Sequence, residues 1–90
     1  MSSEVIPSVW LLRWYAAQAL TLLERVPEAV TANRDVVERN PGAWFAWVAL
    51  GQLYSRQQDR TRAIEAYERA LELNPGDQVA RDDLTRLRES

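Results

Sequence analysis

Apolar residues recur at three- and four-residue steps through most of this chain, the spacing that lines one face of a helix. Trp47, Leu50 and Tyr54, for example, share one helical face. Later in the chain, polar residues fill most of the positions between the apolar ones. No stretch shows the strict alternation of a strand. The pattern predicts an all-α fold with five helices, near residues 8–24, 28–39, 44–57, 60–73 and 77–88.

Helix start and stop signals support these limits. Ser8 and Asp59 are residue types that cap helix N-termini, and Pro27 suits a first helical turn. Pro75 lacks an amide hydrogen and restrains Asn74 from helical geometry, so a helix must end there.

The chain contains an internal repeat. Pro7, Pro41 and Pro75 are evenly spaced, each number exceeding the last by 34. The same offset relates other residues of the same type: Trp10 and Trp44, Gln18 and Gln52, Ala29 and Ala63, Asn40 and Asn74, Gly42 and Gly76. We therefore expect one structural unit to occur twice.

The second copy carries a specific motif, W-x2-L-G-x2-Y followed by A-x3-F/Y-x2-A and P, as Trp47, Leu50, Gly51, Tyr54, Ala63, Tyr67, Ala70 and Pro75. With this motif the chain resembles the tetratricopeptide repeat (TPR) family. The resemblance implies antiparallel helical hairpins stacked as a short right-handed α-solenoid. It divides the chain into a disordered lead-in (1–7) and a single domain (8–90), with a degenerate repeat (8–43), a full repeat (44–77) and a C-terminal capping helix (78–90).

The first copy departs from the family pattern at core positions. Arg13 stands where Trp47 does, and Asn33 where Tyr67 does. Because these two positions pack against each other in the family, one hypothesis is a hydrogen bond from the Arg13 guanidinium to the Asn33 side-chain carbonyl. The alternative is that the first helix is rotated and Arg13 is exposed.

The first helix is apolar almost all the way round, and such a helix is normally buried on several sides. At the end of a stack it would leave an apolar patch of the kind that marks an interface. We therefore predict a homodimer, with a missing upstream domain of a longer protein as the alternative cover. The residues concerned are Leu11, Leu12, Trp14, Tyr15, Leu20, Leu22 and Leu23.

Composition restricts the chemistry. The formal charge of −2 and pI near 5.1 argue against nucleic acid as a partner, because phosphate binding needs a clustered basic surface. The chain has no His, no Cys and no Lys, so it lacks imidazole bases, thiol nucleophiles, Cys/His zinc sites and a phosphate-loop lysine. We expect no enzymatic activity, no cofactor and no metal. The exclusive use of Arg is typical of a GC-rich bacterial genome.

One segment, residues 5–23, has enough apolar character to be considered for targeting or membrane insertion. Glu4 precedes it with no basic residue, unlike a signal peptide, and Arg13 interrupts it at a position where insertion would be costly. We therefore expect a cytoplasmic protein. A membrane-associated adaptor that uses the aromatic first helix is the alternative.

The resemblance also implies a function: TPR arrays bind protein or peptide partners in a concave groove lined by the first helix of each pair. The groove positions of the family correspond here to Leu11, Trp14, Gln18, Thr21, Phe45, Val48, Gln52, Ser55 and Arg56. We expect Trp14 and Phe45 to act as apolar anchors and Gln18 and Gln52 to pair with a partner's backbone. Family members that grip chaperone C-terminal tails use a Lys/Asn carboxylate clamp there, which this chain lacks.

Overall fold

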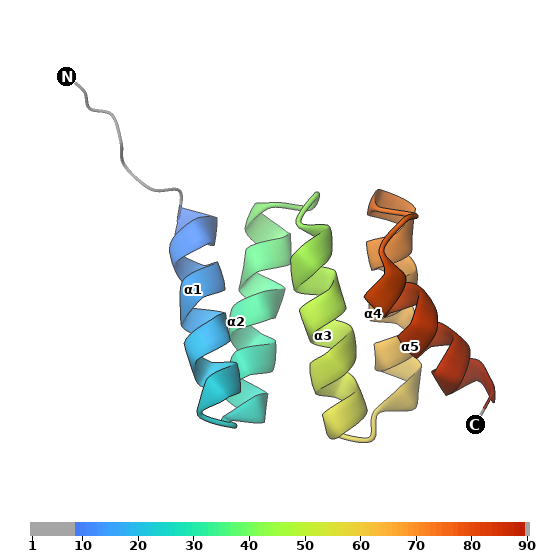
Figure 1. The fold of residues 1–90 in the computed structure, drawn as a ribbon. Helices are drawn as coiled ribbons and strands as arrows, with labels where there is room; N and C mark the ends of the chain where they lie inside the picture. The colour runs from blue at the N-terminus through green and yellow to red at the C-terminus, as the bar shows by residue number, and fades with distance from the viewer. Residues whose placement is uncertain (1–8, 90) are drawn as a thin grey trace.

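The computed structural model describes residues 9–89, and that part of the chain is all helix and turn, with no strand. Figure 1 shows α1, α2 and α3 side by side in chain order, with α5 crossing in front of α4. The predicted lead-in over residues 1–7 lies outside the described residues. The elements are α1 (Val9–Leu22), α2 (Val26–Arg39), α3 (Trp44–Arg56), α4 (Arg60–Leu73) and α5 (Gln78–Glu89).

Neighbouring helices pack as antiparallel hairpins, α1 with α2 and α3 with α4, and α2 also packs against α3. The last helix, α5, lies against α4 and touches α3. Ala80 and Leu84 bury its apolar face, and an ion pair between Arg88 and Glu68 joins it to α4. The all-α stack of hairpins expected from the sequence is therefore present.

The helix ends follow from local chemistry. The Asp59 carboxylate accepts a hydrogen bond from the Arg62 backbone N–H at 3.2 Å, which confirms the predicted cap of α4. Asn40 and Asn74, each followed by a proline, end α2 and α4 with nearly the same backbone angles, φ −137° and −142°. The internal repeat therefore extends to the backbone conformation.

The turns inside the two hairpins also match each other. Glu24 and Gln58 both have positive φ, 59° and 60°, the left-handed conformation common just beyond a helix C-terminus. In each turn the next backbone N–H, of Arg25 or Asp59, bonds a carbonyl five residues back at 2.9 Å. Because Glu24 is left-handed, α1 ends at Leu22 and not at residue 24 as predicted.

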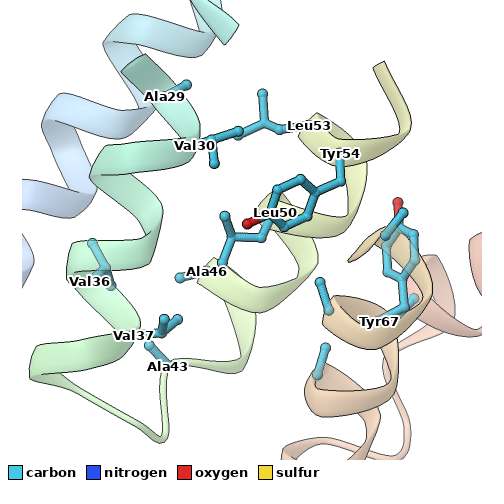
Figure 2. Close-up of a cluster of buried hydrophobic side chains, with 14 of the residues drawn as sticks. Ala29, Val30, Val36, Val37, Ala43, Ala46, Leu50, Leu53, Tyr54 and Tyr67 are labelled. Atoms are coloured by element: carbon cyan, nitrogen blue, oxygen red, sulfur yellow. The ribbon is translucent and has the colours of Figure 1, made fainter. Parts of the chain in front are cut away.

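The core is one apolar cluster that runs from α2 through α3 and α4 to α5. Figure 2 shows its centre, where Val30 lies beside Leu53 and Val37 beside Ala43. Trp47 packs against this cluster and Tyr67 is buried in it, so these two aromatic residues belong to one core, as expected.

Gly51 makes the close packing of α3 against α4 possible. A Cβ atom at residue 51 would lie 2.6 Å from the ring of Tyr67, well inside van der Waals contact. The ring cannot easily move away, because it is 1% exposed and its hydroxyl is bonded to Asp83. The glycine of the motif is therefore required by the tyrosine that faces it.

The proposed hydrogen bond from Arg13 to Asn33 is wrong. Arg13 pairs with Asp35, its Nε lying 3.1 Å from a carboxylate oxygen, and its side chain stays half exposed. Asn33 is buried, with its amide nitrogen donating to the Ala29 carbonyl at 2.9 Å and its side-chain oxygen unpartnered. A charged guanidinium loses its hydration when it is buried. By pairing with Asp35 at the surface, Arg13 avoids the cost of entering the interior beside Asn33. The exposure of Arg13, which the alternative hypothesis predicted, is confirmed, and Ala17 is buried at the position that corresponds to Gly51.

Candidate functional site

The first helix of each hairpin and the last helix, α1, α3 and α5, form one surface of the molecule with two adjoining hollows. The first hollow lies between α1 and α3 and has a volume of about 340 Å³. Its lining residues are Gln18, Thr21, Ala49, Gln52, Leu53 and Arg56. We call the surface that carries both hollows the groove face.

The second hollow lies between α3 and α5, with α4 beneath it, and has a volume of about 410 Å³. Its lining residues are Gln52, Ser55, Tyr67, Asp83, Arg86 and Leu87. Gln52 borders both hollows, so the two are continuous along the groove face.

The second hollow is the first one repeated. Adding the repeat period of 34 to five lining residues of the first hollow gives five lining residues of the second. The pairs are Gln18 and Gln52, Thr21 and Ser55, Ala49 and Asp83, Gln52 and Arg86, and Leu53 and Leu87. The groove face therefore presents two equivalent positions, one repeat apart.

The chemistry of the two positions differs. The first hollow is bordered by the amides of Gln18 and Gln52, and the Thr21 hydroxyl donates to the Ala17 carbonyl at 2.9 Å. Arg56 lies 3.9 Å from the carboxylate of Glu24, and both side chains are well exposed, so this ion pair contributes little. The first hollow can therefore offer both donors and acceptors to a ligand.

The second hollow has a more constrained wall. The Tyr67 hydroxyl donates to an Asp83 carboxylate oxygen at 2.9 Å, and the other oxygen of Asp83 pairs with Arg86. Burial raises the pKa of Tyr67 far above its usual value, and the Asp83 carboxylate raises it further. Tyr67 therefore stays a neutral donor in the physiological pH range.

A cluster of aromatic rings joins the N-terminal halves of α1 and α3. Trp14 meets Phe45 edge to face with ring centroids 4.8 Å apart, and Trp10 and Trp44 lie 6.0 and 5.8 Å from Phe45. Such contacts stabilise helix packing. Trp14 and Phe45, predicted as anchors for a partner, are thus half-buried against each other.

The nine groove residues expected from the sequence fall into two groups. Gln18, Thr21, Gln52, Ser55 and Arg56 line the hollows. Trp14, Phe45 and Val48 pack on the apolar core, and Leu11 is half-buried and borders neither hollow.

Sequence reasoning missed the contribution of α5. Asp83, Arg86 and Leu87 complete the second hollow together with Tyr67 from α4. The repeat period was the available signal, because it carries Ala49, Gln52 and Leu53 onto these three positions of α5.

Two further findings concern the described residues only. They contain no group of three acidic side chains arranged to hold a metal ion. None of the helices between residues 9 and 89 has the length and apolar character needed to cross a bilayer.

Comparison with known proteins places residues 44–77 in a family. This segment matches the family model described as tetratricopeptide repeat. The chain is 39% identical over 56 residues to the peroxisomal targeting signal receptor of Pichia angusta, covering 62% of this chain and 10% of that protein. It is 31% identical over 71 residues to human protein O-mannosyl-transferase TMTC1, covering 79% of this chain and 8% of that protein. The chain thus spans about a tenth of the length of these curated relatives.

Solved structures share the fold. The solution structure of a tetratricopeptide repeat domain protein from Salinibacter ruber superposes with a TM-score of 0.70 at 24% identity, covering 93% of this chain and 84% of that one. A crystal structure of a tetratricopeptide repeat domain protein from the same organism gives 0.68 at 24% identity, covering 89% of each chain. Residues 44–77 are thus a tetratricopeptide repeat, and the chain has the stacked-hairpin fold of the tetratricopeptide repeat domain proteins.

Proposed function

We propose that the chain is a non-catalytic protein-interaction module that binds an extended segment of a partner protein along its groove face. TPR repeats generally mediate protein–protein interaction. The observation that carries the proposal is that the two hollows are equivalent in register and share Gln52. A surface with two equivalent hollows suits a ligand whose own chemical groups repeat along its length. An extended peptide backbone is such a ligand.

The polar residues of the groove face fit this ligand. A side-chain amide both donates and accepts, so it can pair with the N–H and C=O groups of a peptide. Gln18 and Gln52 offer two such amides one repeat apart, and Gln52 is exposed. Side chains of an extended segment alternate in direction, so one set would enter the hollows while the other points to solvent.

The two hollows differ in what they would accept. The second is the larger and has Leu87 and the Tyr67 ring in its wall, so it suits an apolar side chain of the partner. The first, bordered by amides and a hydroxyl, suits a polar one. The partner segment we expect therefore carries an apolar residue and a polar residue on the same side of an extended backbone.

Peptide selection tests this function. We expect a displayed library of random peptides to yield binders with that alternation, and Gln52→Ala to weaken the binding of a selected peptide about tenfold or more by removing a shared contact. Gln57→Ala is the matched control, because Gln57 is exposed at the end of α3 and borders neither hollow. Binders that respond equally to both substitutions, or that bind elsewhere on the chain, would contradict the proposal.

We also propose that the chain self-associates. Large apolar side chains of α1, among them Leu12, Tyr15 and Leu22, are exposed, and so is Leu23 directly after the helix. Exposed apolar surface of this extent on one helix is typical of an interface. Light scattering of the purified chain tests this part of the function, and a strictly monomeric particle at every concentration would contradict it.

A further inference from the structure

We propose that α1 pairs with α1 of a second copy of this chain, antiparallel, about a two-fold axis that passes beside Ala16. This inference rests on the proposed self-association and specifies its face and its symmetry. The face, which we call the outer α1 face, consists of Val9, Leu12, Tyr15, Ala16, Ala19, Leu22 and Leu23.

The outer α1 face is continuous and uncharged. At 100° per residue its members occupy one arc of the helix. Every member is exposed, with Leu22 at 85% and Tyr15 at 63%. Arg13, the single charged residue of α1, lies at the edge of the arc and is already paired with Asp35. Two such faces can therefore meet without repulsion between like charges.

The internal repeat shows what this type of face does elsewhere in the molecule. One repeat later, the equivalents of Val9, Leu12, Ala16 and Ala19 are Ala43, Ala46, Leu50 and Leu53, all of them buried. Ala46, Leu50 and Leu53 lie on the side of α3 that packs against the valines of α2, and Ala43 lies directly before that helix (Figure 2). These four members of the outer α1 face are thus the counterparts of a helix-packing surface, and no helix between residues 9 and 89 covers them in α1.

A second copy fits the open face because the face is complementary to itself. A two-fold axis perpendicular to the helix and level with Ala16 places Val9 opposite Leu23 of the second copy, and Leu12 within about one residue's rise of Ala19 of the second copy. Ala16 lies near its own counterpart, where a small side chain lets two helices approach closely. Large residues thus face small ones at the centre, as packed helices require.

The size of the interface sets its strength. α1 has 14 residues and is therefore about 21 Å long, so one helix pair buries less than the ~1,600 Å² of a standard stable interface. We expect a reversible dimer whose population depends on protein concentration.

The arrangement has a consequence for the groove face. A two-fold axis perpendicular to the plane of the two α1 helices keeps both groove faces on the same side of the dimer. The row of helices then runs from α5 to α1 in one copy and from α1 to α5 in the other. Two groove faces would adjoin, with Tyr15 of each copy beside the junction, and a long or two-fold symmetric partner would engage both.

Disulfide trapping tests the symmetry. The chain has no cysteine, so Ala16→Cys introduces a single thiol. Under mild oxidation we expect Ala16→Cys to form a cross-linked dimer quickly, because the two thiols lie near the axis. Thr85→Cys is the control, since residue 85 is also exposed but lies on α5, and we expect it to stay largely uncross-linked.

Sedimentation velocity over a range of concentrations tests the face. We expect Leu12→Arg to shift the chain to monomer without loss of helicity by circular dichroism, while Val79→Arg, an equivalent change on α5, leaves the dimer unchanged. A dimer that survives Leu12→Arg and is not trapped by Ala16→Cys would overturn this inference and leave self-association standing. A wild-type chain that stays monomeric would overturn both this inference and the proposed self-association. The proposal that the groove face binds a peptide would still stand.

Discussion

The two hairpins of this chain follow one plan at the backbone and two plans in the core. Their internal turns have the same left-handed residue and the same hydrogen bonds, at Glu24 and at Gln58. Between the helices, the second hairpin packs the Tyr67 ring against Gly51. The first hairpin has Ala17 and Asn33 at the same positions, both buried.

This difference shows that the hairpin tolerates two solutions for the same space. In the second hairpin a large ring faces a glycine, and in the first hairpin a smaller amide faces the methyl group of an alanine. Both combinations let the two helices pack closely. In the second hairpin the buried polar atom has a partner, because the Tyr67 hydroxyl donates to Asp83 on α5. In the first hairpin the side-chain oxygen of Asn33 has no hydrogen-bond partner. We therefore expect the second hairpin to be the more stable of the two.

The largest effect should come from giving the second hairpin the residue of the first. Tyr67→Asn removes a fully buried ring and its bond to Asp83, and we expect a loss of about 3–5 kcal/mol in the free energy of unfolding by urea titration. Tyr67→Phe keeps the ring and should lose only about 1 kcal/mol. Equal losses for the two variants would show that the ring itself contributes nothing.

Gly51→Ala should have the next largest effect. Alanine favours helix by about 1 kcal/mol over glycine, but the added methyl would lie 2.6 Å from the Tyr67 ring, so we expect a net loss of about 1–3 kcal/mol by thermal or urea unfolding. In a Tyr67→Asn background the same change should become neutral or stabilising. A loss that persists in that background would mean that the ring does not exclude the methyl group.

Asn33→Leu should stabilise the first hairpin. The substitution replaces a buried, half-satisfied amide with an apolar side chain of similar shape, and we expect a gain of about 1 kcal/mol in urea unfolding. Asn33→Asp, which places a carboxylate in the same site, should destabilise the chain. A loss with leucine would indicate that the amide has a partner, such as a buried water molecule.

The smallest effect concerns the turn that the hairpins share. Gln58 has φ 60°, which glycine adopts without strain, so Gln58→Gly should raise the free energy of unfolding by about 0.5–1 kcal/mol. Gln57→Gly is the control, because Gln57 has φ −84° and gains nothing from glycine. A gain at residue 57 as large as that at residue 58 would refute this explanation.

Sequence patterns predicted most of this fold because its core is made by residue types at fixed spacing. Leu50, Gly51, Tyr54, Ala63 and Tyr67 are buried where the motif places them. The packing of Arg13 could not be predicted in the same way. The motif gives the position of a side chain along the helix but not whether a longer, charged replacement turns toward the interior or toward a surface carboxylate such as Asp35.

The candidate site was predicted in part. Gln18, Thr21, Gln52, Ser55 and Arg56 border the hollows because the position of a residue on its helix decides which side it faces. The aromatic residues depended on what their rings meet in three dimensions. Trp14 and Phe45 reach each other across two helices, and spacing along one helix does not reveal such a contact.

The hydrogen bond between Tyr67 and Asp83 stands in the wall of the second hollow, and the hollow has one side on α3 and the other on α5. A molecule that fills it therefore also holds the last helix in place. By thermodynamic linkage, fraying of the chain's C-terminal turn and occupancy of the groove oppose each other. Ligand binding in the second hollow would then slow amide hydrogen exchange throughout α5, including residues on the side of the helix that the ligand does not contact.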